Sequence, residues 1–258
     1  MTTDVLASYE VLGVPVSVVT PQIAVERIES WAKDHDGRFV CIRDVASLMA
    51  IADDPALKDL HADAAMITPD GTPIALIGKL RGLPVRRTCG PDLIDEVMRR
   101  SPESGVRHFL YGGKPGVADK LADVFRARYP GVQIVGTYCP PFGNISAEEE
   151  AMICRTIRTS GADVVWVGLS SPKQDIWMWR HYKDLPQTLI GVGAAFDFHT
   201  GAVARAPKWM RNNGLEWAHR FAQEPQRLRR RYLVLAPSFV IRAALAELRR
   251  IMRRVPVR

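Results

Sequence analysis

The sequence predicts a doubly wound, Rossmann-like α/β fold with a mainly parallel sheet, followed by a helical, basic C-terminal appendage. Segments typical of strands and of amphipathic helices alternate at short spacing from Gly13 to Phe198, which is the pattern of repeated βα units. The later strand candidates are continuous apolar runs, as expected for strands that helices cover on both faces. We therefore divide the chain into an α/β body, residues 1–201, and an appendage, residues 202–258.

Each strand is predicted from an apolar or alternating run that turn residues bound. These runs lie at 13–20, 38–45, 65–67, 107–111, 132–138, 163–169 and 188–198, with a short basic candidate at 84–88. Helices are predicted between them because apolar residues recur at helical spacing and proline stands near several helix starts. The predicted helices begin at Pro21, cover 47–62, 72–82 and 91–100, end at Tyr129, cover 146–160 and begin again at Pro172.

Composition is ordinary for a globular protein, with 47% hydrophobic and 24% charged residues among 258. There is no run of eighteen apolar residues, and the first residues lack the basic start and apolar core of a secretory signal. The cysteines form no CxxC pair, and their spacing suits neither zinc nor a disulfide framework, so we expect buried thiols in a reducing cytoplasm. They are Cys41, Cys89, Cys139 and Cys154.

The net charge of +7 is unevenly placed. From Arg205 onward the chain is rich in arginine, whereas its only acidic residues there are Glu216, Glu224 and Glu247. Such a basic segment indicates nucleic acid, an anionic membrane surface or phosphorylated substrates as partners.

The turn at Pro69-Asp70-Gly71 holds the first candidate for chemistry. An apolar run enters it, and a helix is expected to open with Thr72 as N-cap and Pro73 as the first helical residue. A carboxylate between a strand end and a helix N-terminus lies where open α/β sheets bind ligands, which makes Asp70 a candidate base. Taken alone, the segment is more simply a β-turn.

Three other strand-to-helix turns should share the same sheet edge. Asp44 follows the second main strand, Gly112-Gly113-Lys114 follows the strand at 107–111, and Ser170 to Asp175 follows the strand at 163–169. The glycine-rich turn is compatible with phosphate binding at a helix start, and equally with a plain turn that needs glycine. It matches neither the Walker A nor the GxGxxG spacing.

The segment GVGAAFDFHTG places small residues and Asp197 at the end of the last predicted strand. Small residues there favour close approach of a ligand or, at least as often, tight packing of a helix on the sheet. His199 is a lone histidine without a metal-type partner nearby, so we interpret it as structural. No pattern predicts a metal or another cofactor.

The C-terminal segment combines arginines with aromatic residues, and its last part has one apolar helical stripe. Interleaved aromatic and basic residues are compatible with nucleic acid. The stripe, with arginines on the other faces, is typical of an interfacial helix on anionic lipid, but it also suits packing on the body or on a second copy. The stripe residues are Ile241, Leu245, Leu248, Met252 and Val255.

Several segments together resemble the WecG/TagA/CpsF family of bacterial glycosyltransferases. They are ITPDG, YGGKPG, SSPKQDIW, GVGAAFDFHTG and RAPKWMRNNGLEWAHRFAQEPQRLRRRY, in order between about residues 44 and 232. The resemblance implies an inverting, metal-independent transfer from a UDP-sugar to a polyprenyl-diphosphate-linked sugar, in synthesis of teichoic acid or another cell-surface polysaccharide. It also implies that residues 1–201 are catalytic and that the appendage completes the site near the membrane.

By this resemblance Asp70 is the catalytic base. Ile42 and Asp44 stand where the family usually has Thr-x-Asn, and Asp175 replaces the glutamate of the family's Pro-Lys-Gln-Glu. We expect Arg205, Arg220, Arg227 or Arg230 to stabilise the departing diphosphate, because arginine stays charged and binds phosphate with two prongs. The candidate substrate-binding residues are Asp44, Gly71, Thr72, Gly112, Gly113, Lys114, Lys173, Gln174, Asp197, Arg205, Arg220, Arg227 and Arg230.

The expected partners are a UDP-sugar, a polyprenyl-diphosphate-linked sugar and an anionic membrane surface, with a homo-oligomer possible and no nucleic acid expected. The expected location is cytoplasmic, peripheral on the inner face of the bacterial cell membrane. Three other interpretations stay open at this point. They are a nucleotide-dependent enzyme such as a dehydrogenase, a nucleic-acid-binding protein, and a lipid-surface scaffold without catalysis.

Overall fold

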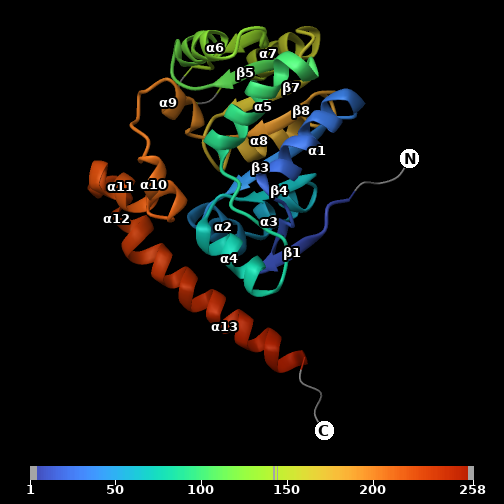
Figure 1. Ribbon diagram of the computed structural model, residues 1–258. Coiled ribbons are helices and arrows are strands. Elements are labelled where there is room, and N and C mark those ends of the chain that lie inside the picture. The colour runs from blue at the N-terminus through green and yellow to red at the C-terminus, as the bar shows by residue number, and fades with distance from the viewer. Residues whose placement is uncertain (1–4, 142, 144, 255–258) are drawn as a thin grey trace.

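The computed structural model describes residues 5–254, except 142 and 144. Its main sheet has six strands, all parallel, in the order β4-β3-β8-β7-β5-β6 (Figure 1). The predicted α/β class with a parallel sheet is therefore confirmed. The strands are β3 (Arg38–Arg43), β4 (Met66–Pro69), β5 (Arg107–Gly112), β6 (Gln133–Tyr138), β7 (Val164–Gly168) and β8 (Thr188–Gly191).

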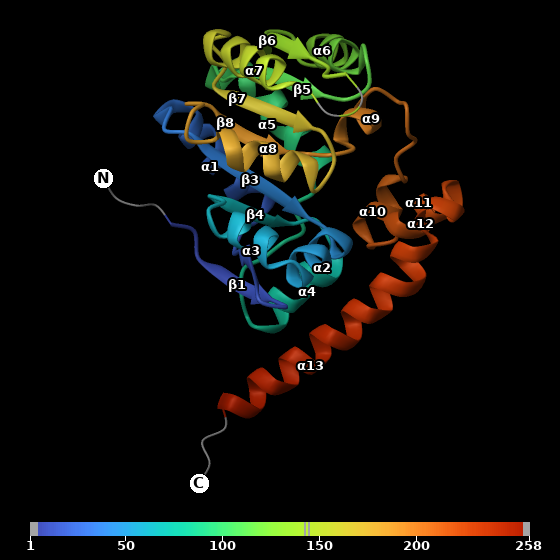
Figure 2. The ribbon, with the colours of Figure 1, turned by 180° about the vertical axis from the view of Figure 1, so that it is seen from behind.

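Helices cover both faces of this sheet (Figures 1 and 2). Alternate strand residues enter two separate cores, so that Val40 packs in one, and Phe39 and Cys41 in the other. The first core is closed by α1 (Pro21–Asp34), α5 (Gly90–Ser104) and α6 (Val117–Arg128). The second is closed by α3 (Pro55–Ala62), α7 (Ala147–Thr159) and α8 (Lys173–His181).

The first predicted strand belongs to a separate hairpin of β1 (Ser8–Val11) and β2 (Val14–Ser17). The turn between them has positive φ at Leu12 and Gly13, which suits a two-residue hairpin turn. The Ser17 hydroxyl accepts a hydrogen bond of 2.9 Å from the Ile67 N–H on β4 and so attaches the hairpin to the outer strand of the main sheet. A third core forms between the hairpin, α2 (Val45–Asp53) and α4 (Thr72–Leu80).

Several predicted boundaries are wrong for local reasons. The helix predicted at 47–62 is two helices, because Pro55 cannot continue a helix and Asp54 instead caps α3. The segment 84–88 is irregular rather than a strand. The last strand ends at Gly191, and Asp197 lies on α9 (Ala195–His199). At α4, Gly71 is the N-cap and Thr72 is already the first helical residue.

After α9 the chain crosses the carboxyl edge of the sheet and ends in a long helix that leaves the body (Figure 1). Phe239 and Ala243 on this helix pack into the hairpin core, and Glu247 pairs with Arg81 of the body. The elements are α10 (Lys208–Asn212), α11 (Glu216–Gln223), α12 (Pro225–Arg230), the π-helical turn η1 (Arg231–Leu235) and α13 (Ala236–Arg254).

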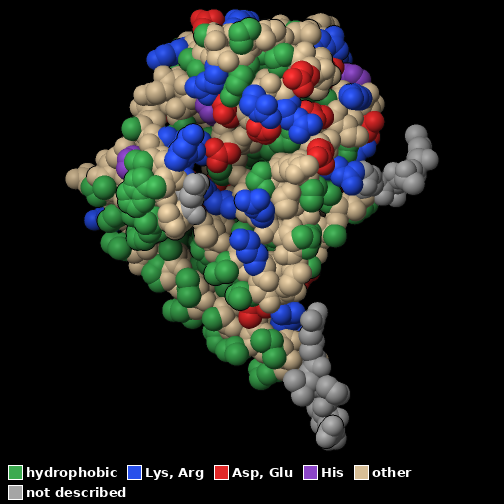
Figure 3. Space-filling view, viewed as in Figure 1, with side chains coloured by type: hydrophobic (Ala, Val, Ile, Leu, Met, Phe, Trp, Pro, Cys, Tyr) green, Lys and Arg blue, Asp and Glu red, His purple; other side chains and the backbone are tan. Residues whose placement is uncertain are grey.

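The rest of α13 keeps an uncovered apolar face. The predicted stripe residues Ile241, Leu245, Leu248 and Met252 are exposed, whereas Val255 lies outside the described residues. Figure 3 shows hydrophobic side chains gathered along this helix. In the part of the chain that the structure describes, no helix combines the length and apolar character needed to cross a bilayer.

Candidate active site

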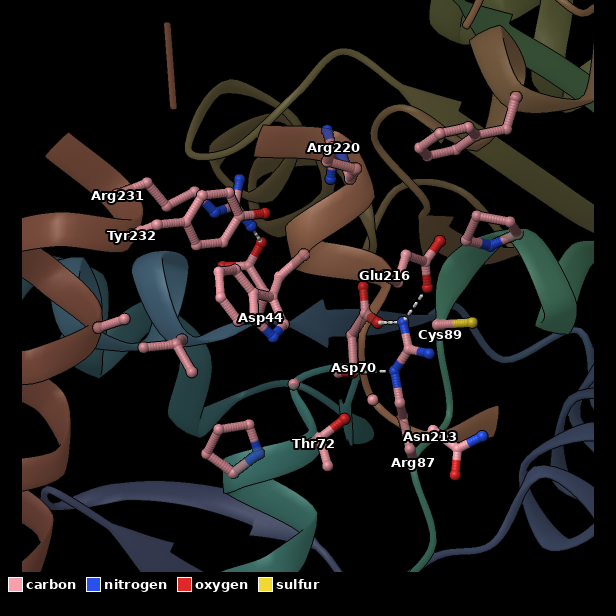
Figure 4. A pocket seen from close by; sticks show the side chains of 18 residues that line it. Asp44, Asp70, Thr72, Arg87, Cys89, Asn213, Glu216, Arg220, Arg231 and Tyr232 are labelled. Atoms are coloured by element: carbon pink, nitrogen blue, oxygen red, sulfur yellow. Dashed lines mark hydrogen bonds and ion pairs between the residues drawn. The ribbon is translucent and has the colours of Figure 1, made fainter. Parts of the chain in front are cut away.

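Two adjacent strand ends bring two aspartates together. Arg43 of β3 is in register with Pro69 of β4, so that Asp44 and Asp70, the next residue on each strand, both emerge at the carboxyl edge. The Asp70 N–H donates to the Arg43 carbonyl at 2.9 Å, which fixes the backbone of this turn. Figure 4 shows both carboxylates in one pocket.

The aspartates lie where two cavities meet. Cavities of about 410 and 440 Å³ share Asp44, Asp70, Arg220 and Arg231 among their lining residues. The first, here the aromatic cavity, continues toward α4 and α11. The second, here the loop cavity, continues toward the turns after β7 and β8. The aromatic cavity adds Thr72, Arg87, Glu216, Trp217 and Tyr232, and the loop cavity adds Ser170, Ser171, Gln174, Gly193 and Arg227.

Arg87 connects Asp70 to the C-terminal segment (Figure 4). Its Nη2 lies 3.0 Å from Asp70 Oδ1 and 2.7 Å from Glu216 Oε2, and its Nε donates to the Asp70 carbonyl at 2.6 Å. Burial raises the pKa of the Asp70 carboxyl, Arg87 opposes that rise, and the charges of Asp44 and Glu216 add to it. A carboxylate with a raised pKa is a stronger base than an exposed one.

Asp44 has the opposite electrostatic environment. Its carboxylate caps α2 by accepting from the Ser47 N–H at 2.9 Å, and it pairs with Arg231 of η1. Burial raises the pKa of Asp44, but the charge of Arg231 and the Ser47 hydrogen bonds outweigh it, so that the pKa lies below its usual value. Two neighbouring carboxylates with pKa values shifted apart suit different tasks: Asp44 stays ionised, and Asp70 is suited to exchange a proton.

Aromatic rings from the C-terminal segment lie over this pair. Tyr232 packs against Trp217 and Phe221, with ring centroids 5.7 and 5.9 Å apart. The guanidinium of Arg220 lies 5.3 Å from the ring centroid of Phe198 on α9. These contacts hold cations beside the carboxylates within a partly apolar enclosure, where electrostatic interactions are stronger than in water.

The predicted site residues fall into two groups. Those that line the cavities are Asp44, Asp70, Gly71, Thr72, Gln174, Arg220 and Arg227. Those that line neither cavity are Gly112, Gly113, Lys114, Lys173, Asp197, Arg205 and Arg230.

Members of the second group have other contacts. The Gly113 N–H donates to the Gly168 carbonyl, and a Cβ at Gly112 would lie 2.6 Å from the same peptide group, so packing requires glycine there. Lys173 binds the Gly143 carbonyl, and Arg205 pairs with Asp92. The imidazole of His199, expected to be structural, lies 2.8 Å from the Pro91 carbonyl oxygen.

Sequence reasoning missed Arg87 and gave no role to Arg231 or Tyr232. Arg87 lies in the segment predicted as a strand, and only its position before the helix start at Gly90 signalled proximity to the sheet edge. Among the residues that the structure describes, one group could offer ligands to a metal: Cys41, His61 and Asp175 place ligand atoms within 4.8 Å of one another. Arg43 donates to two of these atoms, at His61 and Asp175.

Open parallel α/β sheets bind ligands at the carboxyl edge of their strands, and the two cavities that share Asp44 and Asp70 lie at this edge. The model of the glycosyl transferase WecG/TagA/CpsF family matches residues 9–253, and the chain belongs to this family. This match agrees with the resemblance that the sequence segments indicated. The chain is therefore a member of a glycosyltransferase family, and its interpretation as a dehydrogenase is wrong.

Proposed function

We propose that this protein transfers a hexose or an N-acetylhexosamine-type sugar from a UDP-sugar to a polyprenyl-diphosphate-linked sugar. The transfer inverts the anomeric centre and needs no metal ion. It serves synthesis of a cell-surface polysaccharide or teichoic acid. The observation that carries the proposal is the position of Asp70, whose carboxylate lies where two cavities meet and can contact a substrate in each.

Asp70 is the general base of this reaction. It takes the proton of the acceptor hydroxyl as that oxygen bonds to the anomeric carbon from the face opposite the leaving group. The bond between the anomeric carbon and the phosphate oxygen breaks, and UDP departs with the electron pair. Arg87 holds Asp70 from two sides, at Oδ1 and at the carbonyl, so the base is fixed in place before substrates bind.

Arginines support departure of the diphosphate. Arg220 and Arg231 line both cavities, and Arg227 lines the loop cavity. A guanidinium remains charged at all working pH values and binds phosphate oxygens through a planar pair of N–H groups. Their charge favours the state in which negative charge collects on the leaving UDP.

We assign one substrate to each cavity, and the residues that line the cavities support this assignment. The loop cavity adjoins the first turn of α8 and the glycine-containing turn after β8, which suits the UDP moiety. The aromatic cavity is lined by Trp217 and Tyr232 and by Ala236, the first residue of α13. We therefore place the lipid-linked acceptor there, with its lipid directed along α13.

The uncovered face of α13 provides the membrane contact. Exposed apolar residues continue from Leu233 and Val234 in η1 along α13 to Met252. Arg249 is exposed on the same helix, whereas Arg242 and Arg250 pair with Asp53 and Glu247. The apolar face suits a peripheral position on the inner face of the cell membrane, and each exposed cation, such as Arg249 or Arg253, adds about 1 kcal/mol on an anionic surface.

The test is UDP release by the full chain in EDTA, with a panel of UDP-sugars and with or without polyprenyl-diphosphate-linked sugars in detergent. Release that requires both one donor and an acceptor supports the proposal and identifies the substrates. Release at an equal rate by Asp70→Asn would refute the role of the base. A folded chain that releases UDP from no donor favours the scaffold without catalysis.

A further inference from the structure

An arginine is completely buried directly beneath the catalytic edge. Arg43, the last residue of β3, has a side chain with 0% exposure, and its Nη2 lies 2.6 Å from Asp175 Oδ1 on α8, itself 2% exposed. Arg43 immediately precedes Asp44, and Asp175, like Gln174, lines the loop cavity. The Arg43–Asp175 ion pair therefore connects β3, which leads into Asp44, to α8, whose first turn borders the loop cavity.

The guanidinium also binds two neutral groups. Its Nη1 donates to Ser171 Oγ at 2.9 Å, and its Nη2 lies 2.6 Å from His61 Nε2 on α3. The Nδ1 of His61 lies 2.5 Å from the Leu57 carbonyl and donates to it, so that Nε2 is left to accept from Arg43. Burial, together with the charge of Arg43, lowers the pKa of His61 to about 4, and the imidazole is neutral at neutral pH.

This arrangement excludes an ion among the three potential ligands. A metal at Cys41, His61 and Asp175 would need the lone pairs of His61 Nε2 and Asp175 Oδ1, and Arg43 already donates to both atoms. The guanidinium supplies the positive charge that this group of residues requires. Arg43 at the end of β3 therefore binds His61 of α3, Ser171 of the turn after β7 and Asp175 of α8, and holds these segments together.

The segment held most directly is the turn at 170–174. Ser170 has a positive φ of 66°, a conformation that needs support from its surroundings. Ser171 receives a hydrogen bond from Arg43 and donates one to Asp175, so its hydroxyl is committed on the buried side. Gln174 then extends the support, because its Oε1 accepts from the Gly193 N–H at 3.1 Å in the opposite wall of the loop cavity.

We propose that Arg43 is a positioning residue for the sugar-nucleotide donor. It holds the turn at 170–174 against the end of β3, and so sets the width of the loop cavity between Asp44 and the turn after β8. This inference rests on the proposed function, because it assigns the UDP-sugar to the loop cavity. Arg43 acts through Ser171 and Asp175 and needs no contact with the donor.

A contribution to the stability of the fold does not by itself explain why this ion pair is buried here. A buried ion pair is often no more stabilising than apolar residues of similar volume. Within the described residues, the Nε of Arg43 has no hydrogen-bond partner, so the network is not fully satisfied. The pair Arg107–Asp163 offers a comparison, because it lies in the same sheet at the opposite, amino edge of β5 and β7.

The test replaces the network in two ways and measures steady-state kinetics of the full chain. Arg43→Met combined with Asp175→Leu removes both charges and leaves no unpaired one. Arg43→Lys keeps the charge, but a single ammonium cannot span Ser171, His61 and Asp175 as the planar fork does. Asp163→Asn is the matched control at the other edge of the sheet.

We expect the double variant to raise the donor KM roughly tenfold to a hundredfold, as for a displaced binding group, with the acceptor KM and kcat near wild type. Arg43→Lys should raise the donor KM in the same direction, and Asp163→Asn should leave it unchanged. An unchanged donor KM in a folded double variant would overturn the proposal. So would one tightly bound metal per chain in the purified protein, or equal changes in both KM values and kcat.

Binding of UDP to the wild-type chain, measured by calorimetry, distinguishes failure of the proposed function from failure of the role of Arg43 alone. Wild-type protein that neither binds UDP nor transfers sugar refutes the proposed function and the donor role of Arg43 with it. Wild-type protein that binds UDP and transfers sugar, with a double variant of the same UDP affinity, refutes the role of Arg43 alone.

Discussion

Replacing Arg87 with glutamine should change the pH dependence of sugar transfer in a defined direction. Burial raises the pKa of Asp70, and Arg87 is the group that opposes this rise, whereas Asp44 and Glu216 reinforce it. Glutamine keeps hydrogen-bonding capacity at this position and removes the positive charge. Arg87→Gln should therefore raise the pKa of Asp70 further.

The size of the shift follows from the geometry. Arg87 Nη2 and Asp70 Oδ1 are 3.0 Å apart, and Coulomb's law gives about 5 kcal/mol for that separation at an effective dielectric constant of about 20. The side chains are 26% and 28% exposed, so water screens the pair and reduces the interaction to about 1–2 kcal/mol. That corresponds to roughly one pKa unit.

The assay is the pH profile of kcat/KM, which reports groups of the free enzyme. Asp70 must be ionised to accept a proton, so activity is lost as the pH falls through its pKa. The acid limb of Arg87→Gln should lie about one pH unit above that of wild type. Glu216→Gln should move the limb in the opposite direction, because the negative charge of Glu216 raises the pKa of Asp70.

Arg86→Gln is the matched control. Arg86 is exposed and next to Arg87 in the chain, so this substitution removes the same charge from the surface. An acid limb that stays in place in Arg87→Gln, or moves to lower pH, would refute Asp70 as the titrating base. Equal shifts in the Arg86 and Arg87 variants would assign the effect to net charge rather than to the contact.

Four further outcomes are expected. Asp70→Asn should lower kcat by about 10²- to 10⁴-fold while UDP still binds, as calorimetry would show. Phe239→Ala should lower the free energy of unfolding by about 3–5 kcal/mol, measured by urea denaturation, because Phe239 is buried in the hairpin core. Burial lowers the pKa of His61 to about 4 and of His108 to about 3. The free energy of unfolding should therefore fall by about 1.4 kcal/mol per histidine for each pH unit between about pH 6.5 and about pH 4. Constant stability from about pH 6.5 down to about pH 4.5 would contradict this. Leu248→Glu should reduce sedimentation with anionic vesicles about tenfold or more, because an exposed leucine on α13 no longer inserts.

The parallel sheet was predictable because short apolar runs in the sequence identify several of its strands. The runs at 109–111 and 164–167 are continuously apolar, and such strands have few alternatives to burial between two helical layers. The same logic located Asp44 and Asp70 at one edge, since residues that follow parallel strands must emerge together. The hairpin escaped prediction because Ser8–Val11 is only four residues long and is fixed by its partner β2 and by packing on α4.

The pairing of charges was not predictable in this way. Arg87 and Glu216 are far apart in the sequence, and so are Asp44 and Arg231, and no local pattern states which arginine meets which carboxylate. The segment around Arg87 has the composition of a strand, but it forms no strand ladder: the Arg86 N–H donates to the Val19 carbonyl, and the Thr88 N–H to the carbonyl of Pro69 at the end of β4. Tertiary contacts therefore decided both its conformation and its role.

The two ion pairs connect the C-terminal segment to the chemistry of the edge. Burial is the main cause of the raised pKa of Asp70, and Glu216 of α11 adds to it, whereas the charge of Arg231 of η1 lowers the pKa of Asp44 against the effect of burial. The same segment supplies Arg220 and the aromatic rings over the carboxylates. It also leads directly into α13, whose uncovered apolar face suits a lipid surface. If Asp70 is the base that we propose, contacts that hold α11 and η1 in place contribute to its proton-accepting strength, so that this strength depends in part on the C-terminal segment.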